Sequence, residues 1–129
     1  MELRYDRLFF RSELEGMFGI YCREIGVEQL IFLALDLDVQ VTEFDIGTSK
    51  KDDTANWSSY FKMLKKYGKN GSEKSKYKGH CITGVTIWGI NDENSWVSNG
   101  GKQFPLIFKK SGSSYLTKEC FYSVLEAAN

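Results

Sequence analysis

Residues 39–46 read VQVTEFDI, and this stretch decides the fold class. Apolar and polar side chains alternate along it and several are β-branched, which predicts a strand that ends at Gly47. Residues 81–88 read CITGVTIW and have the same character, so they predict a second strand, ending at Gly89.

Helical patterns accompany both strands. Apolar residues recur at spacings of three and four over residues 27–35, which predicts an amphipathic helix before the first strand. A second helix follows Asp53 or Thr54, either of which can act as the N-cap, and ends at Gly68. A third is expected over residues 116–128. The predicted apolar stripes of the last two helices are Trp57, Tyr60, Phe61 and Leu64, and Phe121, Val124, Leu125 and Ala128.

Residues 14–22 also have the character of a strand, so the order from there is strand, helix, strand, helix, strand, helix. This alternation is typical of an α/β fold with a parallel sheet and covering helices. Residues 68–79 are expected to form a basic, solvated loop and residues 90–104 a long polar loop. A short apolar segment and a turn over residues 109–114 precede the last helix.

Length and composition narrow the class of protein. The 129 residues suit one domain, and 17 basic against 17 acidic residues argue against nucleic acid or a membrane surface as partner. No apolar run is long enough to span a membrane, and no signal peptide is expected in the chain as given. Cys22, Cys81 and Cys120 are widely spaced, so we expect free thiols, with no metal and no cofactor.

Chemically active side chains gather at the two predicted strand ends. Glu43 and Asp45 close the first strand, and Trp88 closes the second, with Trp96 in the loop that follows. Parallel α/β folds place their active groups at the carboxyl ends of strands. A carboxylate beside indole rings is suited to a sugar, because the ring stacks on the pyranose and the carboxylate stabilises an oxocarbenium-like centre.

These motifs resemble the glycoside hydrolase family 10 xylanases. VQVTEFDI is similar to the seventh barrel strand of that family, and ITGVTIWGINDENSW is similar to its eighth strand and following loop. FPLIF resembles the segment after that loop, and CFYSVLEAAN resembles the last barrel helix. The resemblance covers residues 36–129, with the four motifs in the family's order.

The resemblance implies a partial (β/α)8 TIM barrel, about the last three βα units, in one domain over residues 1–129. Residues 36–129 correspond to the seventh and eighth units, and residues 14–35 loosely to the sixth. Residues 1–13 are unassigned. A complete barrel of this class has roughly 250 residues, so the chain resembles its C-terminal part.

The resemblance also assigns roles. Glu43 matches the nucleophile of a retaining mechanism, Trp88 the tryptophan beneath the sugar, and Trp96 the tryptophan of the loop that covers it. Supporting roles are expected for Asp45, which closes the catalytic motif, and for Asp92 and Ser95, which would pin the loop through short side-chain to backbone bonds.

Two elements of the family pattern are missing. The motif of the acid/base glutamate is absent, and the glutamates that remain lack its context: Glu13, Glu15, Glu24 and Glu28. Residues 19–22 lack the glutamine and histidine of the family's sixth strand. His80 is the only histidine and is expected at the surface, on the amino-terminal side of the barrel.

Three hypotheses follow. The first is an endo-β-1,4-xylanase segment acting on xylan or xylo-oligosaccharides, inactive alone and completed by self-association or a second chain. The resemblance would place the intact enzyme outside the cell. The second is a non-catalytic carbohydrate-binding remnant that uses Trp88 and Trp96 as stacking platforms. The third is a small α/β inhibitor or immunity domain whose motifs match by chance.

Overall fold

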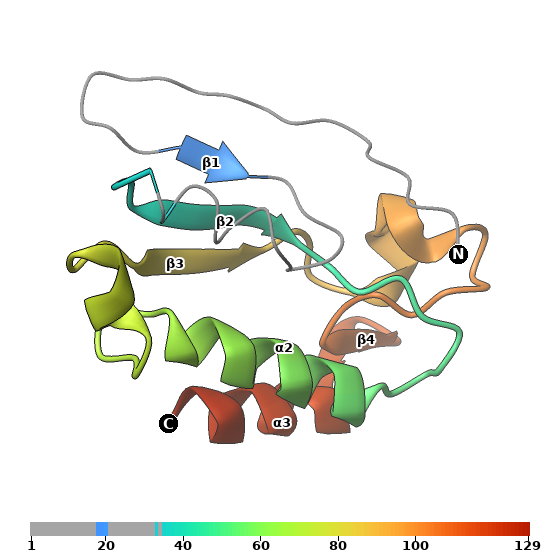
Figure 1. The fold of residues 1–129 in the computed structure, drawn as a ribbon. Coiled ribbons are helices and arrows are strands. Elements are labelled where there is room, and N and C mark those ends of the chain that lie inside the picture. Colours follow the sequence, from blue (N-terminus) through green and yellow to red (C-terminus); the bar gives the residue numbers. More distant parts are fainter. Residues whose placement is uncertain (1–17, 21–32, 34) are drawn as a thin grey trace.

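The computed structural model describes residues 18–20, 33 and 35–129. Its elements in chain order are β1 (Phe18–Ile20), β2 (Val39–Phe44), α2 (Thr54–Lys66), η1 (Lys74–Tyr77), β3 (Ile82–Ile87), η2 (Asp92–Asn94), η3 (Trp96–Ser98), β4 (Phe108–Ser111), β5 (Ser114–Thr117) and α3 (Glu119–Ala128). Figure 1 shows the described strands β1, β2 and β3 side by side above the two helices.

The three strands form a parallel sheet in the order β1-β2-β3. Neighbours in the sheet are also neighbours in the chain, as they are in a barrel built from successive βα units. The β-branched residues of β2 and β3 explain why these segments are strands, because such side chains pack well on a pleated surface. The predicted parallel sheet is therefore confirmed for the described strands.

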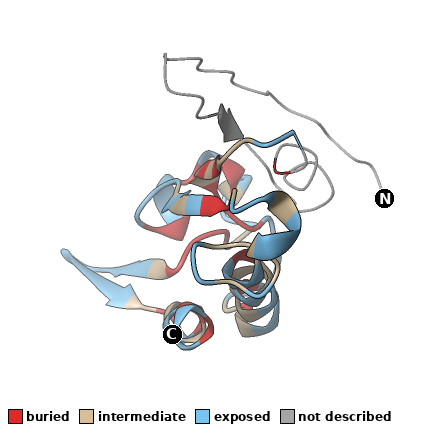
Figure 2. Cartoon of the chain, turned by 60° about the vertical axis from the view of Figure 1, so that its left-hand side comes forward, coloured by how far each residue is buried: buried red, intermediate tan, exposed pale blue. Residues whose placement is uncertain are grey.

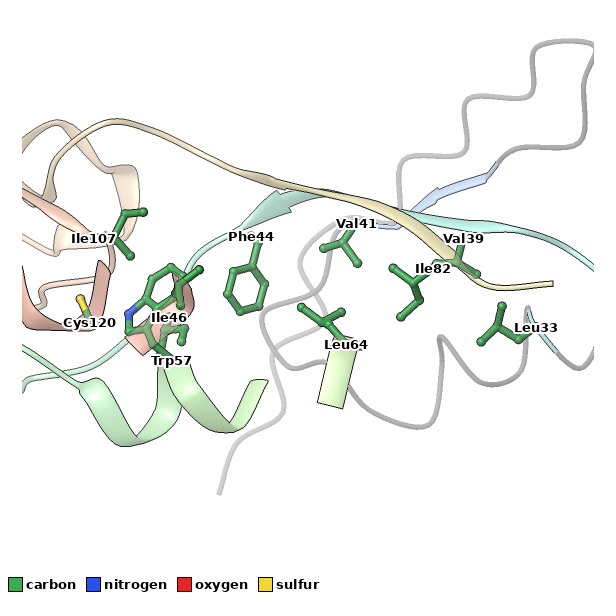
Figure 3. Close-up of a cluster of buried hydrophobic side chains, with 11 residues drawn as sticks. Leu33, Val39, Val41, Phe44, Ile46, Trp57, Leu64, Ile82, Ile107 and Cys120 are labelled. Atoms are coloured by element: carbon green, nitrogen blue, oxygen red, sulfur yellow. The ribbon is translucent and has the colours of Figure 1, made fainter. Parts of the chain in front are cut away.

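One face of the sheet packs on α2, and α3 lies beside α2 on the same side (Figure 1). The core between sheet and helices is a row of fully or almost fully buried side chains, drawn in Figure 3. Phe44 meets Trp57 edge to face, with ring centroids 5.2 Å apart. The rest of the row includes Leu33, Val39, Val41, Ile46, Leu64, Ile82, Ile107 and Cys120.

Two adjacent aspartates hold the first turns of both helices. Asp53 is the N-cap of α2, since its side chain accepts a hydrogen bond from the backbone N–H of Asn56. Asp52 points to the other helix and accepts the backbone N–H groups of Glu119 and Cys120, at 2.6 Å and 2.7 Å. The loop after β2 therefore fixes where α2 and α3 begin, and its carboxylates complement the positive helix ends.

The expectations for the C-terminal region were partly wrong. Residues 109–114 form most of a β4–β5 hairpin, which is exposed along most of its length (Figure 2). The last helix begins at Glu119 and not at residue 116. Its buried stripe is Cys120, Val124 and Ala127, whereas Leu125 and Ala128, which were assigned to the stripe, are exposed. The buried face is the one that α3 turns to the core beside α2, and apolar spacing within α3 alone does not identify it.

The predicted strands and the helix between them agree with the structure, whereas the loops expected over residues 68–79 and 90–104 contain the short 3-10 helices η1, η2 and η3. The strands at residues 39–46 and 81–88 are observed as β2 and β3, each slightly shorter than predicted. The helix after Asp53 is observed, and Asp53 rather than Thr54 is its N-cap. The predicted helix over residues 27–35 lies almost wholly outside the described residues, as does most of the predicted strand over residues 14–22.

Candidate active site

The candidate site lies at the carboxyl ends of β2 and β3, which are adjacent in the sheet. Trp88 directly follows β3, and its backbone N–H donates to the carbonyl oxygen of Phe44, at 3.0 Å. The loops beyond the two strands are also joined, because the N–H of Ile46 donates to the carbonyl oxygen of Pro105 and the N–H of Phe104 to that of Thr48. The structure thus brings the acidic strand end and the tryptophan-bearing strand end together.

Glu43 lies at an irregularity of β2. Val41 pairs with Val85 and Phe44 pairs with Ile87, so β2 contains one more residue than β3 over this interval. An extra residue of this kind is a β-bulge, which re-aims side chains and is frequent beside active sites. It allows both Val41 and Phe44 to face the core on α2, although a regular strand would turn them to opposite faces. Glu43 is left outside that core, half-buried.

Asp45 follows β2 directly and is 1% exposed. It lies two residues from Glu43, at the same end of the sheet. A buried carboxylate is expensive unless polar groups surround it, so its place beside the candidate nucleophile is typical of a functional site and less typical of a solvated strand end.

Trp88 and Trp96 are both half-exposed, at 48% and 53%, although tryptophan is usually among the most buried residues. Gly89 turns the chain after Trp88, with a backbone φ of +124° that other residues rarely adopt. A Cβ at Gly89 would lie 2.8 Å from Cδ1 of Leu106, so the glycine also permits close packing of the loop. Trp88 therefore lies beside a tightly packed turn, and both indoles are exposed to solvent.

The loop that carries Trp96 is ordered by two short 3-10 turns. Asn91 caps η2, accepting from the N–H groups of Glu93 and Asn94. Ser95 caps η3 through the N–H of Val97, at 3.2 Å. Asp92 was expected to make bonds of the same short range, and the structure corrects this: it accepts the distant N–H of Leu106, at 2.8 Å, and pairs with Lys118.

Nothing in the sequence pattern indicated that Lys118 pairs with Asp92. Lys118 is 3% exposed, and its ammonium lies 3.0 Å from the Asp92 carboxylate. A lysine that precedes a helix normally belongs to a solvated surface, so nothing in the local pattern distinguishes this one. Asn91 was missed as well, although an Asn directly before a short turn is a recognisable capping signal.

Two further titratable residues, His80 and Cys120, are poor candidates for the site. His80 precedes β3, so it is at the end of the sheet opposite Glu43, where its Nδ1 lies 3.5 Å from Asp38. Burial raises the pKa of the Cys120 thiol to about 12, so this thiol is protonated at neutral pH. Within the described ranges, no group of three or more His, Cys, Asp or Glu residues could hold a metal ion. None of the helices in those ranges is long and apolar enough to cross a bilayer.

Parallel strands with a carboxylate and two exposed indoles at their carboxyl ends are the arrangement that a sugar site in an α/β barrel requires. A family model identifies which barrel family the chain belongs to. The model of glycosyl hydrolase family 10 matches residues 25–127, and the chain belongs to that family. The resemblance stated from the motifs is confirmed, and the hypothesis that the motifs match by chance is wrong.

The curated relatives are xylanases. The chain is 31% identical to endo-1,4-beta-xylanase A of Caldicellulosiruptor saccharolyticus, over 74% of this chain and 30% of the relative. It is 32% identical to a beta-1,4-xylanase of Dictyoglomus thermophilum, over 74% of this chain and 29% of the relative. The chain therefore spans less than a third of the length of these proteins.

Solved structures agree on the fold. A family 10 xylanase from Bispora sp. MEY-1, determined with xylobiose, superposes with a TM-score of 0.57 at 18% identity, over 78% of this chain and 30% of that one. A Clostridium thermocellum endo-1,4-beta-D-xylanase 10B, determined with xylohexaose, gives 0.57 at 23% identity, over 76% of this chain and 18% of that one. The described chain is thus a partial TIM barrel.

Proposed function

We propose that this chain supplies the nucleophile side of a retaining endo-β-1,4-xylanase site, with Glu43 as the nucleophile. The observation that carries the proposal is the arrangement at the carboxyl ends of β2 and β3. Glu43 lies at a bulge of β2, and the residue after it, Phe44, accepts a hydrogen bond from the backbone N–H of Trp88. In this mechanism the carboxylate attacks the anomeric carbon, the glycosidic bond breaks, and water later hydrolyses the glycosyl ester.

Trp88 and Trp96 would hold the sugar. Their half-exposed indoles offer apolar faces, and pyranose rings stack on such faces through their C–H groups. Asp45 would support the catalytic hydrogen-bond network from its buried place after β2. The substrate class is β-1,4-xylan or xylo-oligosaccharides, and an extracellular place of action accords with a polymeric substrate.

The general acid must come from elsewhere in the barrel. Retaining enzymes use two carboxyl groups about 5–5.5 Å apart, and the leaving oxygen needs a proton that the nucleophile cannot give. Loss of the acid alone typically lowers the rate by a factor of about 10²–10⁴. We therefore propose that residues 36–129 are the seventh and eighth βα units, with residues 14–35 as the sixth, and that they are inactive without the rest.

The described sheet has an edge at which the remaining strands of the barrel could pair. β3 is an edge strand in the described part of the chain, and an unpaired edge is a template for another strand. The last helix, α3, also has an unburied apolar face. It exposes Tyr122 and Leu125, at 53% and 46%, in addition to the stripe that it buries. A helix that is apolar on two faces is typical of one packed between neighbours. The completing units would come from a second polypeptide or from a longer form of the same one.

The test is hydrolysis of xylan by a completed barrel. Residues 36–129 would be joined to the preceding part of the Dictyoglomus thermophilum xylanase, and reducing sugar would be measured with Glu43→Gln and with Glu93→Gln, an exposed glutamate of the nearby loop. We expect Glu43→Gln to abolish hydrolysis at an unchanged melting temperature and Glu93→Gln to retain it. Retained activity in Glu43→Gln would rule out the assigned nucleophile.

A second readout separates a nucleophile from a residue that only positions the sugar. In Glu43→Ala, azide can enter the space left by the carboxylate and attack the anomeric carbon from the same side. We expect azide to restore turnover of an aryl β-xylobioside, with a product of inverted, α configuration. Restored turnover with a β-configured azide product would assign Glu43 the acid/base role instead.

Carbohydrate binding without hydrolysis is the second candidate, and the exposure of Trp88 and Trp96 favours it for the chain taken alone. It predicts that xylohexaose quenches indole fluorescence equally in the unmodified chain and in Glu43→Gln, and that Trp96→Ala lowers the affinity. If neither form binds xylohexaose, the chain alone is not a binding module.

A further inference from the structure

Lys118 occupies an unusual place for a lysine. It directly precedes α3 and is 3% exposed. Its ammonium lies 3.3 Å and 3.0 Å from the two carboxylate oxygens of Asp92, and it donates to the carbonyl oxygens of Leu106 and Phe104, at 2.6 Å and 3.3 Å. An ammonium has three hydrogens to donate, so these four acceptors satisfy it fully.

Asp92 completes a clamp across the loop. One of its oxygens, Oδ1, also accepts the backbone N–H of Leu106, at 2.8 Å. The loop over residues 92–106 is therefore fixed at both ends. Lys118, directly before α3, binds Asp92 at one end and the backbone of residues 104–106 at the other. The tip of the loop at residues 99–102 is exposed and takes no part in the clamp.

The path from the clamp to Trp96 has little freedom. Asp92 begins η2, and Ser95 follows η2 directly, caps η3 through its side chain and is itself buried. Trp96 is the first residue of η3, and the next residue, Val97, is 4% exposed. In the chain, Trp96 is thus flanked by an ion-paired aspartate four residues before it and a buried valine directly after it, so its backbone is anchored on both sides.

The cost of this arrangement indicates a role beyond stability. Removing two charges from water is expensive, and a buried ion pair often stabilises a fold no better than apolar residues of the same size. What such a pair does provide is one defined geometry, because the alternatives leave a buried charge unpaired. Here that geometry belongs to the loop that carries Trp96.

We propose that Lys118 is a positioning residue for the sugar site: through Asp92 it fixes the Trp96 loop, so that the indole is already oriented when a xylo-oligosaccharide binds. The proposal rests on the proposed function for the identity of the ligand. A preorganised loop avoids the entropic cost of ordering on binding, so loss of the clamp lowers affinity without removing any contact to the sugar.

The test uses a charge-neutral pair of substitutions. Lys118→Met alone would leave Asp92 as an uncompensated buried charge and can unfold the chain. The double variant Lys118→Met/Asp92→Asn removes both charges, and the asparagine oxygen can still accept the N–H of Leu106. Lys110→Met, on the exposed strand β4, is the matched control, and Lys118→Arg tests whether another cation restores the clamp.

Two measurements are made on each variant. The first is xylohexaose affinity from indole fluorescence, for which we expect about a tenfold loss in the double variant and none in Lys110→Met. The second is hydrogen exchange at the amides of Val97 and Ser98, which we expect to accelerate about tenfold while the amides of α3 keep their rates. Lys118→Arg is expected to recover part of both.

The outcomes separate this proposal from the function on which it rests. If the unmodified chain does not bind xylohexaose, the binding function fails for the chain alone, and the exchange rates still decide whether Lys118 fixes the loop. Unchanged exchange in a folded double variant would overturn the proposal, as would unchanged affinity in a chain that binds. Uniformly faster exchange across α3 would also overturn it, because the pair would then be a general stabiliser.

Discussion

Asp52 is expected to contribute more to stability than its half-exposed position indicates. Lys118, the residue at the N-cap position of α3, makes no side-chain capping bond, and Asp52 accepts the first two N–H groups of the helix instead, at 2.6 Å and 2.7 Å. Loss of a cap costs about 0.5–2 kcal/mol, and hydrogen bonds to a charged group lie at the upper end. Asp52→Ala should therefore lower the free energy of unfolding by about 2 kcal/mol, and Asp52→Asn by about 1 kcal/mol.

Urea denaturation followed by circular dichroism measures this difference. For a slope of about 1–3 kcal/mol/M, the midpoint for Asp52→Ala should fall by about 1 M with the slope unchanged. The matched control is Asp36→Asn, because the ion pair of Asp36 with Lys78 is exposed and should contribute at most about 1 kcal/mol. If Asp52→Ala and Asp36→Asn have the same midpoint, the capping of α3 by Asp52 does not stabilise the fold.

Three further predictions concern the backbone, pH and thiol reactivity. Gly89→Ala should destabilise the chain by about 1–3 kcal/mol in the same urea assay, because it combines a positive φ with a 2.8 Å approach to Leu106, whereas Gly100→Ala, in open space, should cost less. Burial raises the pKa of Asp53, but hydrogen bonds from Thr48 and Asn56 outweigh it and the pKa is lowered overall. Its contribution is therefore complete above the ordinary value of 3.8 and lost as the pH falls through the lowered value, so stability in Asp53→Asn should decline less steeply with acid than in the unmodified chain. Cys120, with its pKa raised by burial to about 12, should not react with a thiol reagent at pH 8 until urea unfolds the chain, and rapid labelling of this residue in the native state would contradict its packing.

The strands and the helix between them could be predicted because their local pattern and their tertiary role agree. The β-branched residues of β2 and β3 favour strands, and the apolar ones among them, such as Val39, Val41 and Ile82, also belong to the core that the sheet forms with α2. The sequence contains a signal of the bulge at Glu43, which the strand prediction did not take into account. Val41 and Phe44 are both apolar three residues apart, which breaks the period of two, and both are buried on the same side.

The C-terminal errors have a different cause. Tyr115 and Leu116 have spacings compatible with the start of an apolar helix face, but they lie on β5 and are exposed. The hairpin is set by its antiparallel pairing and by Gly112 at its turn, with a φ of +60°, and helical periodicity does not detect either. Helix periodicity therefore placed the start of α3 three residues early.

Roles that depend on distant contacts were beyond prediction from local pattern. Lys118 and Asp92 are far apart in sequence, and nothing in either neighbourhood indicates that they meet. The motif residues Glu43, Trp88 and Trp96 could be named because the family resemblance marks them. The clamp that holds the loop could be found only from the structure.

Covalent trapping tests most directly whether Glu43 is the nucleophile. The completed barrel would be incubated with a dinitrophenyl 2-fluoro-β-xylobioside, whose leaving group needs no acid and whose fluorine slows hydrolysis of the glycosyl-enzyme. Digestion and mass spectrometry would then locate the fluoro-xylobiosyl ester. We expect one ester, on the Glu43 carboxylate, and none in Glu43→Gln. An ester on any other carboxylate, or an equal yield in Glu43→Gln, would contradict it.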